Sequence, residues 1–247
     1  MAAPNPRSHQ SNWHARCPAR DPGRACCGDG WGIDVELIIV RHGETAWTLS
    51  GRHTGATDLP LTEHGRLEAA ALRPLLGHVL AGREPVVYAS PRERAAQTLA
   101  LAMPGVRGNV EPLVAEYDYG TYEGLTHEQI STLRPGWNIW RDGCPAGEST
   151  GGVGARADAF LIGHAEHTPG PVVVVSHGHF SRILAARALG LAADHGRLLG
   201  AGTASVSVVK DFHGERCIAL WNASADLLGA PVALGRSQAV PDAAPGH

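Results

Sequence analysis

Two short stretches of the chain consist almost wholly of branched apolar residues, Leu37–Val40 and Val172–Val175. Runs of this length without polar alternation are typical of central strands that are buried on both faces of a parallel sheet. Each run ends in a polar residue, a histidine and a glycine, at Arg41–Gly43 and Ser176–Gly178. Open α/β sheets bind ligands at the carboxyl ends of their strands, so the pattern predicts that the two histidines share one pocket.

The rest of the pattern alternates strands with helices. Further strands are expected at Pro85–Ala89, around Val110, and as a pair at Ala204–Val209 and Cys217–Trp221 on either side of a turn at Asp211–Gly214. This alternation predicts an α/β fold, a three-layer sandwich in which a mostly parallel central sheet carries helices on both faces.

The expected helices are marked by their first residues and by apolar periodicity. One follows Thr62 as N-cap, one starts at Ser90-Pro91, one follows Thr126, and two more cover about Val153–His167 and the stretch from Gly178 to about Leu189. The helix after Thr62 is expected to bury one face, made of Leu67, Ala70, Ala71, Leu75 and Val79. Residues 47–55 and 136–151 are rich in glycine and polar residues and are expected to be loops.

The folded part is expected to be a single domain over residues 34–228. Residues 1–33 are rich in Pro, Arg, Ala and Gly without any period, which predicts a disordered extension or a misassigned start, with the natural chain beginning near Val35. It lacks the apolar core of a secretory signal. The tail at 229–247 is also rich in Pro, Ala and Gly and is expected to be loose.

Composition and charge narrow the class of protein. The net charge of −3 over 247 residues gives no electrostatic case for nucleic acid or a membrane surface, and no apolar run approaches the roughly 20 residues of a transmembrane helix. The cysteines are odd in number and irregularly spaced, which is unlike a disulfide framework. They are Cys17, Cys26, Cys27, Cys144 and Cys217. Cys26 and Cys27, near His14 and Cys17, are candidate metal ligands, as the weaker alternative to a disordered extension. We expect a cytoplasmic protein.

The residues at the first strand end suggest nucleophilic chemistry. His42 stands beside the permanent cation Arg41 and beside Gly43, which lets a ligand approach the backbone. A histidine in this setting is placed to attack an anionic centre. The alternative interpretation is that Arg41 and His42 have no catalytic role and are ordinary polar residues that cap the end of the strand.

Four separated motifs carry a family resemblance. Arg41–Thr45, Ser90-Pro91 with Arg94 and Gln97-Thr98, Glu116 before Tyr119-Gly120, and Ser176–Gly178 follow one another as in the histidine phosphatase superfamily, the phosphoglycerate-mutase-like group. The resemblance covers roughly residues 35–225. Within it, residues 51–55, 116–124 and 137–144 are similar to a branch that contains sedoheptulose-1,7-bisphosphatases and actinobacterial acid phosphatases.

The resemblance implies roles that agree with the chemistry of these side chains. His42 would attack phosphorus and form a phosphohistidine. Arg41 and Arg94 would clamp the phosphoryl oxygens, and His177 would bond another of them and stabilise the charge that develops. Glu116 would protonate the leaving oxygen and then accept a proton from the attacking water. Because fixed cations supply the electrostatic stabilisation, neither a metal nor another cofactor is expected.

Other residues of the same motifs are candidates for binding the substrate. They are Thr48, Arg52, Thr54, Gly55, Arg92, Tyr119, Arg141 and Gly178. Thr48 departs from the family, where many members have asparagine, and its hydroxyl has a shorter reach. Arg92 and Glu123 are possible substitutes for Arg94 and Glu116.

These features favour a metal-independent phosphatase acting on small phosphate monoesters, sugar phosphates or bisphosphates. Two alternatives remain at this point. A phosphoglycerate-type phosphomutase would use the same histidine but keep water away from it, and a catalytically inactive protein would only bind a phosphorylated ligand. The expected partner is a small phosphorylated metabolite, and a homo-oligomer is possible.

Overall fold

The computed structural model describes residues 36–225, and one mixed sheet organises them. The expectations for residues 1–33 and 229–247 lie outside this range. Along the sheet the strands stand in the order β3-β2-β4-β1-β5-β6. They are β1 (Glu36–Arg41), β2 (Val86–Ala89), β3 (Asn109–Val110), β4 (Pro171–Ser176), β5 (Val206–Phe212) and β6 (Glu215–Ala223).

The two apolar runs form the centre of the sheet. β1 and β4 are parallel neighbours, paired from Glu36 with Pro171 to Arg41 with Ser176. His42 and His177 therefore follow adjacent strands at the same edge, as the sequence predicts. β2 and β3 extend the parallel part beyond β4, whereas β5 pairs antiparallel with both β1 and β6. The predicted mostly parallel sheet thus carries an antiparallel hairpin at one end.

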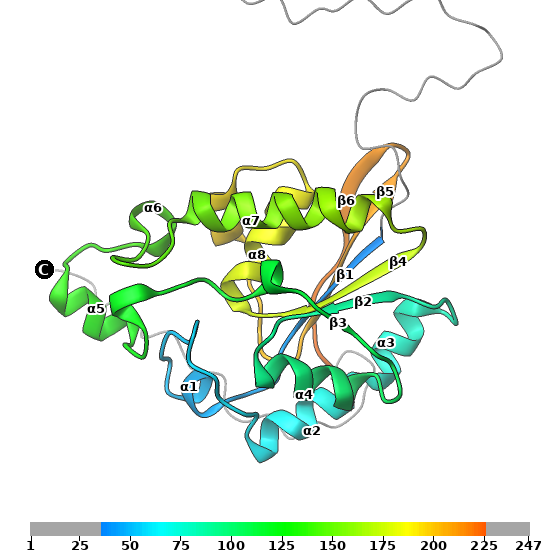
Figure 1. Ribbon diagram of the computed structural model, residues 1–247, viewed down its shortest axis with the longest axis horizontal. Helices are drawn as coiled ribbons and strands as arrows, with labels where there is room; N and C mark the ends of the chain where they lie inside the picture. The colour runs from blue at the N-terminus through cyan, green and yellow to red at the C-terminus, as the bar shows by residue number, and fades with distance from the viewer. Residues whose placement is uncertain (1–35, 226–247) are drawn as a thin grey trace, which may run out of the picture. The chain divides into compact units, whose positions relative to one another are not determined.

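Helices cover both faces of the sheet, which confirms the predicted three layers (Figure 1). Alternate residues of β1 point to opposite sides: Leu37 and Ile39 belong to one buried cluster, and Ile38 and Val40 to the other. The first cluster includes residues of α7 (Thr150–Gly163) and α8 (Gly178–Ala188). The second includes residues of α3 (Arg73–Leu80) and α4 (Glu93–Ala102), together with Leu72, which follows α2 (Glu63–Ala71).

The helix expected after Thr62 is two helices. Thr62 does cap α2, since its hydroxyl accepts a hydrogen bond from the Gly65 N–H. Pro74 lies in the first turn of α3, where its missing N–H is tolerated, and the chain turns at Leu72 before it. The buried face of α2 runs through Gly65 and Ala69 to Leu72, so that Leu67, expected in the core, lies off this face and is 61% exposed.

Short elements account for the other differences from expectation. Both stretches expected to be loops contain a four-residue helix, α1 (Ala46–Leu49) and α6 (Ile139–Asp142). Helix α4 begins two residues after Pro91, with Arg92 as its N-cap. Helix α5 (His127–Leu133) follows Thr126 as predicted, with a capping box from Gln129. The 3-10 turns are η1 (Pro112–Val114), η2 (Gly120–Tyr122), η3 (Ala165–His167) and η4 (Ala193–Leu198).

No helix within residues 36–225 is long and apolar enough to cross a membrane.

Candidate active site

His42 lies directly after β1 and is almost wholly buried, with 3% of its surface exposed. Its Nδ1 is 2.7 Å from the carbonyl oxygen of Gly43. A carbonyl only accepts, so Nδ1 carries the hydrogen and Nε2 keeps the lone pair. Within the described part of the chain Nε2 has no hydrogen-bond partner. The backbone therefore prepares Nε2 for use as a nucleophile.

His177 and Arg94 lie buried beside His42. The two imidazole rings meet edge-on with centroids 5.1 Å apart. The Arg94 Nε donates to His177 Nδ1 at 3.1 Å, so the hydrogen of His177 is on Nε2, which donates to Ser90 Oγ at 2.7 Å. The rest of the Arg94 guanidinium donates to the carbonyl oxygens of Thr54, Gly55 and Thr57. These bonds use four of the five N–H groups of Arg94, so one is left for a further acceptor. His177 would have to give up its bond to Ser90 to contact a phosphoryl oxygen.

Both histidines are held neutral. Burial, together with the charges of Arg41 and Arg94, lowers the pKa of His42 well below its ordinary value of 6.5. Burial and the Arg94 charge lower the pKa of His177 in the same direction. A neutral imidazole keeps its lone pair, so His42 can act as a nucleophile at neutral pH without losing a proton first.

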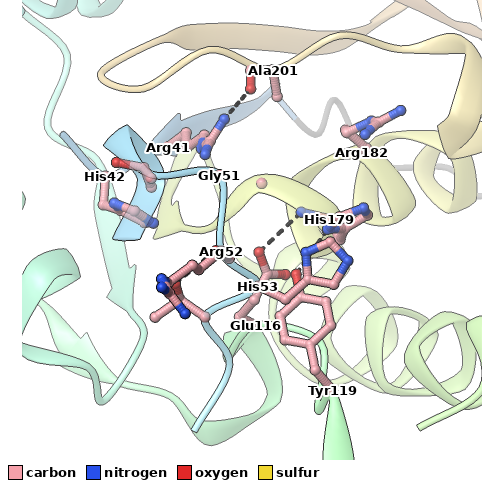
Figure 2. A pocket seen from close by; sticks show the side chains of 13 residues that line it. Arg41, His42, Gly51, Arg52, His53, Glu116, Tyr119, His179, Arg182 and Ala201 are labelled. Carbon is pink, nitrogen blue, oxygen red and sulfur yellow. Dashed lines mark hydrogen bonds between the residues drawn. The ribbon is translucent and has the colours of Figure 1, made fainter. Parts of the chain in front are cut away.

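Glu116 is fixed by the N-terminus of α8. One carboxylate oxygen accepts from the backbone N–H of His179 at 3.0 Å and the other accepts from Phe180 at 2.8 Å and from Tyr117 at 2.9 Å. The helix dipole adds to these charge-assisted bonds. With 8% of its surface exposed, Glu116 still reaches the cavity (Figure 2).

His42 and Glu116 line a cavity of about 180 Å³ at the edge of the sheet where β1 and β4 end. Figure 2 shows the side chains around it, with His42 on the opposite side from His179 and Arg182. The lining consists of Arg41, His42, Thr48, Gly51, Arg52, His53, Thr54, Glu116, Tyr119, Gly178, His179, Arg182 and Ala201. Of the predicted catalytic residues, His42, Arg41 and Glu116 line the cavity, whereas Arg94 and His177 do not line it and lie buried beside His42.

Arg41 passes close to the start of α8. One of its terminal nitrogens donates to the carbonyl oxygen of Ala201, and its Nε is buried without a hydrogen-bond partner among the described residues. A Cβ added at Gly178 would stand 3.3 Å from the guanidinium carbon. The glycine after His177 therefore makes room for Arg41, and the unpartnered Nε remains a donor for an anion.

Several predicted substrate-binding residues do lie at the cavity. Arg52, Thr54, Tyr119 and Gly178 line it, and so does Thr48. The Thr48 hydroxyl, however, donates to the carbonyl oxygen of Thr45 at 2.9 Å and accepts from its N–H at 2.8 Å. A hydroxyl has one hydrogen to give. Thr48 therefore completes the capping box of α1, whose N-cap is Thr45, and its donor is not directed at a phosphate.

Three other candidates lie elsewhere. Gly55 and Arg92 line a second cavity, of about 260 Å³, which shares Glu116 with the first. Arg141 lines neither: its guanidinium pairs with Asp142 at 2.7 Å and its side chain is 68% exposed, so we do not retain it as a substrate contact. Glu123 accepts from the N–H groups of Gly55 and Thr57 and lines neither cavity, so it is no substitute for Glu116.

The sequence analysis missed three polar lining residues, His53, His179 and Arg182. His179 and Arg182 continue the α8 motif, and the spacing of four from Gly178 to Arg182 is a signal for one helix face. His53 lies in the stretch expected to be a loop, and its contacts with Tyr119 and Trp137 join segments far apart in the sequence. Burial lowers the pKa of His53 to about 4, so it too is neutral.

Among residues 36–225, no group of three or more His, Cys, Asp or Glu side chains is arranged to hold a metal ion. Cys17, Cys26 and Cys27, which belong to the weaker sequence-based prediction of a metal site, lie outside these residues.

A family model described as the histidine phosphatase superfamily, branch 1, matches residues 37–224. The chain belongs to this superfamily. The match covers every residue that lines the two cavities. Together with the phosphatases among its relatives, membership makes the protein a phosphoric monoester hydrolase.

Relatives within the histidine phosphatase superfamily are similar over most of the chain. An acid phosphatase of Mycobacterium tuberculosis is 45% identical over 74% of this chain and 90% of its own length. The sedoheptulose 1,7-bisphosphatase of Saccharomyces cerevisiae is 36% identical over 64% of this chain and 69% of its own. A solved structure of a Mycobacterium tuberculosis open reading frame, 42% identical, superposes with a TM-score of 0.73 over 77% of this chain and 98% of that one. The predicted family, branch and fold are thus confirmed.

Proposed function

We propose that this histidine phosphatase hydrolyses small sugar phosphates or bisphosphates without a metal, through a phosphohistidine on His42. The observation that carries the proposal is the hydrogen bond from His42 Nδ1 to Gly43, which leaves the Nε2 lone pair to face a cavity that also contains Arg41 and Glu116. Relatives named for sedoheptulose bisphosphate and glucosyl-3-phosphoglycerate support a phosphorylated sugar as substrate.

The reaction then takes two steps. The lone pair of Nε2 forms a bond to phosphorus while the bond from phosphorus to the ester oxygen breaks, and Glu116 gives a proton to the departing alcohol. In the second step a water attacks the phosphohistidine, Glu116 accepts its proton, and the bond from Nε2 to phosphorus breaks to release phosphate. Arg41 binds the phosphoryl oxygens through its unpartnered Nε.

Arg94 and His177 act on the same group from beneath. Arg94 places a fixed positive charge behind both imidazoles and orients His177 through the bond to Nδ1. When a phosphoryl group arrives, we expect the His177 N–H to move from Ser90 Oγ to a phosphoryl oxygen. Thr54 and Tyr119 line the part of the cavity that is next to the leaving alcohol. A cytoplasmic setting, a small phosphorylated metabolite as the partner and a possible homo-oligomer belong to the same proposal.

The test is phosphate release from a panel of sugar phosphates, sugar bisphosphates and p-nitrophenyl phosphate, with EDTA present. His42→Ala should abolish release and the covalent phosphoenzyme seen by mass spectrometry after rapid quenching. His78→Ala, an exposed histidine on α3, is the matched control and should change neither. Release that survives His42→Ala would refute His42 as the nucleophile. Transfer of the phosphoryl group to a second sugar in place of water would instead identify a mutase.

A further inference from the structure

The peptide group between Gly43 and Glu44 is hydrogen-bonded at both ends. Its carbonyl oxygen, which belongs to Gly43, accepts from His42 Nδ1 at 2.7 Å. Its N–H, which belongs to Glu44, donates to Glu68 Oε2 at 2.8 Å. One planar amide therefore connects the Glu68 carboxylate to the His42 imidazole. We call this chain of two hydrogen bonds the Glu68 relay.

Helix α2 brings Glu68 to this peptide because it packs directly on the turn after β1. A Cβ added at Gly65 would stand 2.1 Å from the carbonyl oxygen of Glu44, so only a glycine allows the approach. Glu68 follows Gly65 by three residues and therefore lies on the same side of the helix, one turn further on. The position of the carboxylate is thus set by the close packing of α2 against the turn.

The other oxygen of Glu68 has different partners. Oε1 accepts from the Thr203 hydroxyl at 3.2 Å and lies 3.5 Å from His64 Nε2. Among residues 36–225 Glu68 forms no ion pair with an arginine or a lysine, although its side chain is only 17% exposed. The Glu44 N–H is the one hydrogen-bond donor to Oε2 in this part of the chain. A largely buried carboxylate is therefore directed at the peptide that orients His42.

A carboxylate at one end of such a chain changes the imidazole at the other. Hydrogen bonds in series polarise one another, so the bond to Glu68 makes the Gly43 oxygen more negative and a stronger acceptor. The stronger bond keeps the hydrogen of His42 on Nδ1. Attack by Nε2 leaves positive charge on the ring, and the relay stabilises that charge. The aspartate of a Ser-His-Asp triad does the same through a direct bond.

We propose that Glu68 is a positioning residue for the nucleophile, which acts on His42 through the peptide between Gly43 and Glu44. The proposal rests on the proposed function for its effect on rate. As the Nε2 lone pair bonds to phosphorus and the bond to the ester oxygen breaks, the hydrogen stays on Nδ1 and Glu68 takes up no proton. The relay makes no contact with substrate, so it should affect the rate of phosphohistidine formation and not substrate binding.

Glu68→Gln tests the charge, because an amide oxygen can still accept from the Glu44 N–H. The rate of phosphohistidine formation from p-nitrophenyl phosphate, measured by rapid quenching, should fall by about 3- to 10-fold, as expected when a neutral hydrogen bond replaces a charge-assisted one. The substrate concentration that gives half the maximal rate should stay within about twofold. Glu63→Gln, an exposed glutamate of the same helix, is the matched control and should change neither value.

Two further variants separate the relay from a structural role of Glu68. Glu68→Ala leaves the Glu44 N–H without its acceptor and should slow phosphohistidine formation by about 10- to 100-fold, and Glu68→Gln should recover most of this loss. Thr203→Val removes only the bond to Oε1 and should stay within about twofold of wild type. If Thr203→Val is as slow as Glu68→Gln, Glu68 acts by holding Thr203 and the relay is wrong.

Proton–nitrogen NMR correlations of the imidazole rings test the relay without substrate, with the His42 signals identified by their loss in His42→Ala. The wild type should carry the hydrogen on Nδ1, and this proton should move upfield in Glu68→Gln as its bond weakens. If the wild type hydrolyses nothing but the proton moves, the relay stands and the phosphatase assignment fails. If the wild type is active and Glu68→Gln changes neither the proton nor the rate of phosphohistidine formation, the assignment of Glu68 is wrong.

Discussion

The two sides of the cavity are built in different ways. On the His42 side the residues follow two central strands, and hydrogen bonds hold His42 to Gly43, His177 to Ser90, and Arg94 to three carbonyl groups. The opposite side, which we call the far wall, consists of Tyr119, His179 and Arg182 and comes from a connection and a helix. Both sides keep polar atoms unpartnered within the described chain, His42 Nε2 and Arg41 Nε on the first and one atom each of His179 and Arg182 on the second. Under the proposed function, the side that follows the strands carries the chemistry and the far wall contacts the alcohol part of the substrate.

Glu116 stands between the two sides, and its replacement should have the largest effect. In Glu116→Gln the general acid is lost, so kcat for a sugar phosphate should fall by about 10²- to 10⁴-fold. The loss should be much smaller for p-nitrophenyl phosphate, whose leaving group departs without protonation. Steady-state kinetics with both substrates measure the contrast.

Glu123→Gln is the matched control for Glu116→Gln. Glu123 also accepts backbone N–H bonds through both carboxylate oxygens, so the amide introduces the same mismatch there. We expect a change in kcat of less than about tenfold, without dependence on the leaving group. An equal loss in both variants would mean that Glu116 only holds the backbone.

The His42 side should tolerate no added atom. A Cβ at Gly43 would stand 2.3 Å from the carbonyl oxygen of Gly65, a backbone atom of α2 that cannot move aside. Gly43→Ala should therefore lower the free energy of unfolding by about 1–3 kcal/mol or more, and it should reduce kcat because the Gly43 carbonyl orients His42. Thermal unfolding and kinetics on the same sample give both values.

Gly77→Ala provides the comparison for Gly43→Ala. Gly77 lies in α3 with nothing within 4 Å of the added Cβ, so alanine should stabilise the helix by up to about 1 kcal/mol. If Gly43→Ala were as harmless as Gly77→Ala, the close approach of the β1 end to α2 would not constrain the site.

Buried neutral histidines on both sides should make stability depend on pH. His42, His53, His177 and His179 all have folded-state pKa values below 6.5, His53 at about 4. Above pH 6.5 these histidines are neutral in both the folded and the unfolded protein, so they do not lower the free energy of unfolding. As the pH falls from 6.5 towards 4, the unfolded chain binds protons that the folded protein does not, so stability is lost. Tm should fall by roughly 5–10 °C between pH 7 and pH 4.5. A flat Tm over this range would contradict the neutral cluster.

The His42 side is also the side that the sequence allowed us to predict. Four-residue apolar runs define buried strands locally, and parallel pairing brings their ends together whatever lies between. Gly43 and Gly178 follow the same logic, because each permits a close approach that a side chain would block.

Of the far wall, Tyr119 was predicted from the sequence to bind substrate, whereas His179 and Arg182 were not, because they meet the other lining residues through tertiary packing. Trp140 lies in a stretch that looks like a loop, yet its ring supports Arg182 from another element. Leu67 shows the same limit in the core: apolar periodicity predicts it inside, but the face of α2 that is buried consists of Gly65 and Ala69 and continues to Leu72. Arg141 was a candidate substrate contact because it lies in a motif of the resembling branch, but in the structure it pairs with the neighbouring Asp142.

The smallest effect should come from the far wall itself. Tyr119→Phe removes the hydroxyl that bonds His179 Nδ1 at 2.8 Å but leaves the ring in the core. One neutral hydrogen bond contributes about 0.5–1.5 kcal/mol, so KM for a hydroxylated substrate should rise about two- to tenfold while kcat changes little. Tyr122→Phe is the matched control, since the Tyr122 hydroxyl has no hydrogen bond to the described residues.

The split between KM and kcat decides whether the two sides are separable. Tyr119 contacts His179 and not His42. Loss of the Tyr119 hydroxyl should therefore weaken binding of the alcohol part equally in the ground state and the transition state, which raises KM and leaves kcat unchanged. If Tyr119→Phe instead lowered kcat as strongly as Glu116→Gln, the hydroxyl would be acting on the position of Glu116 through the His179 N–H. The far wall would then be part of the catalytic apparatus, and substrate choice could not change without altering the chemistry.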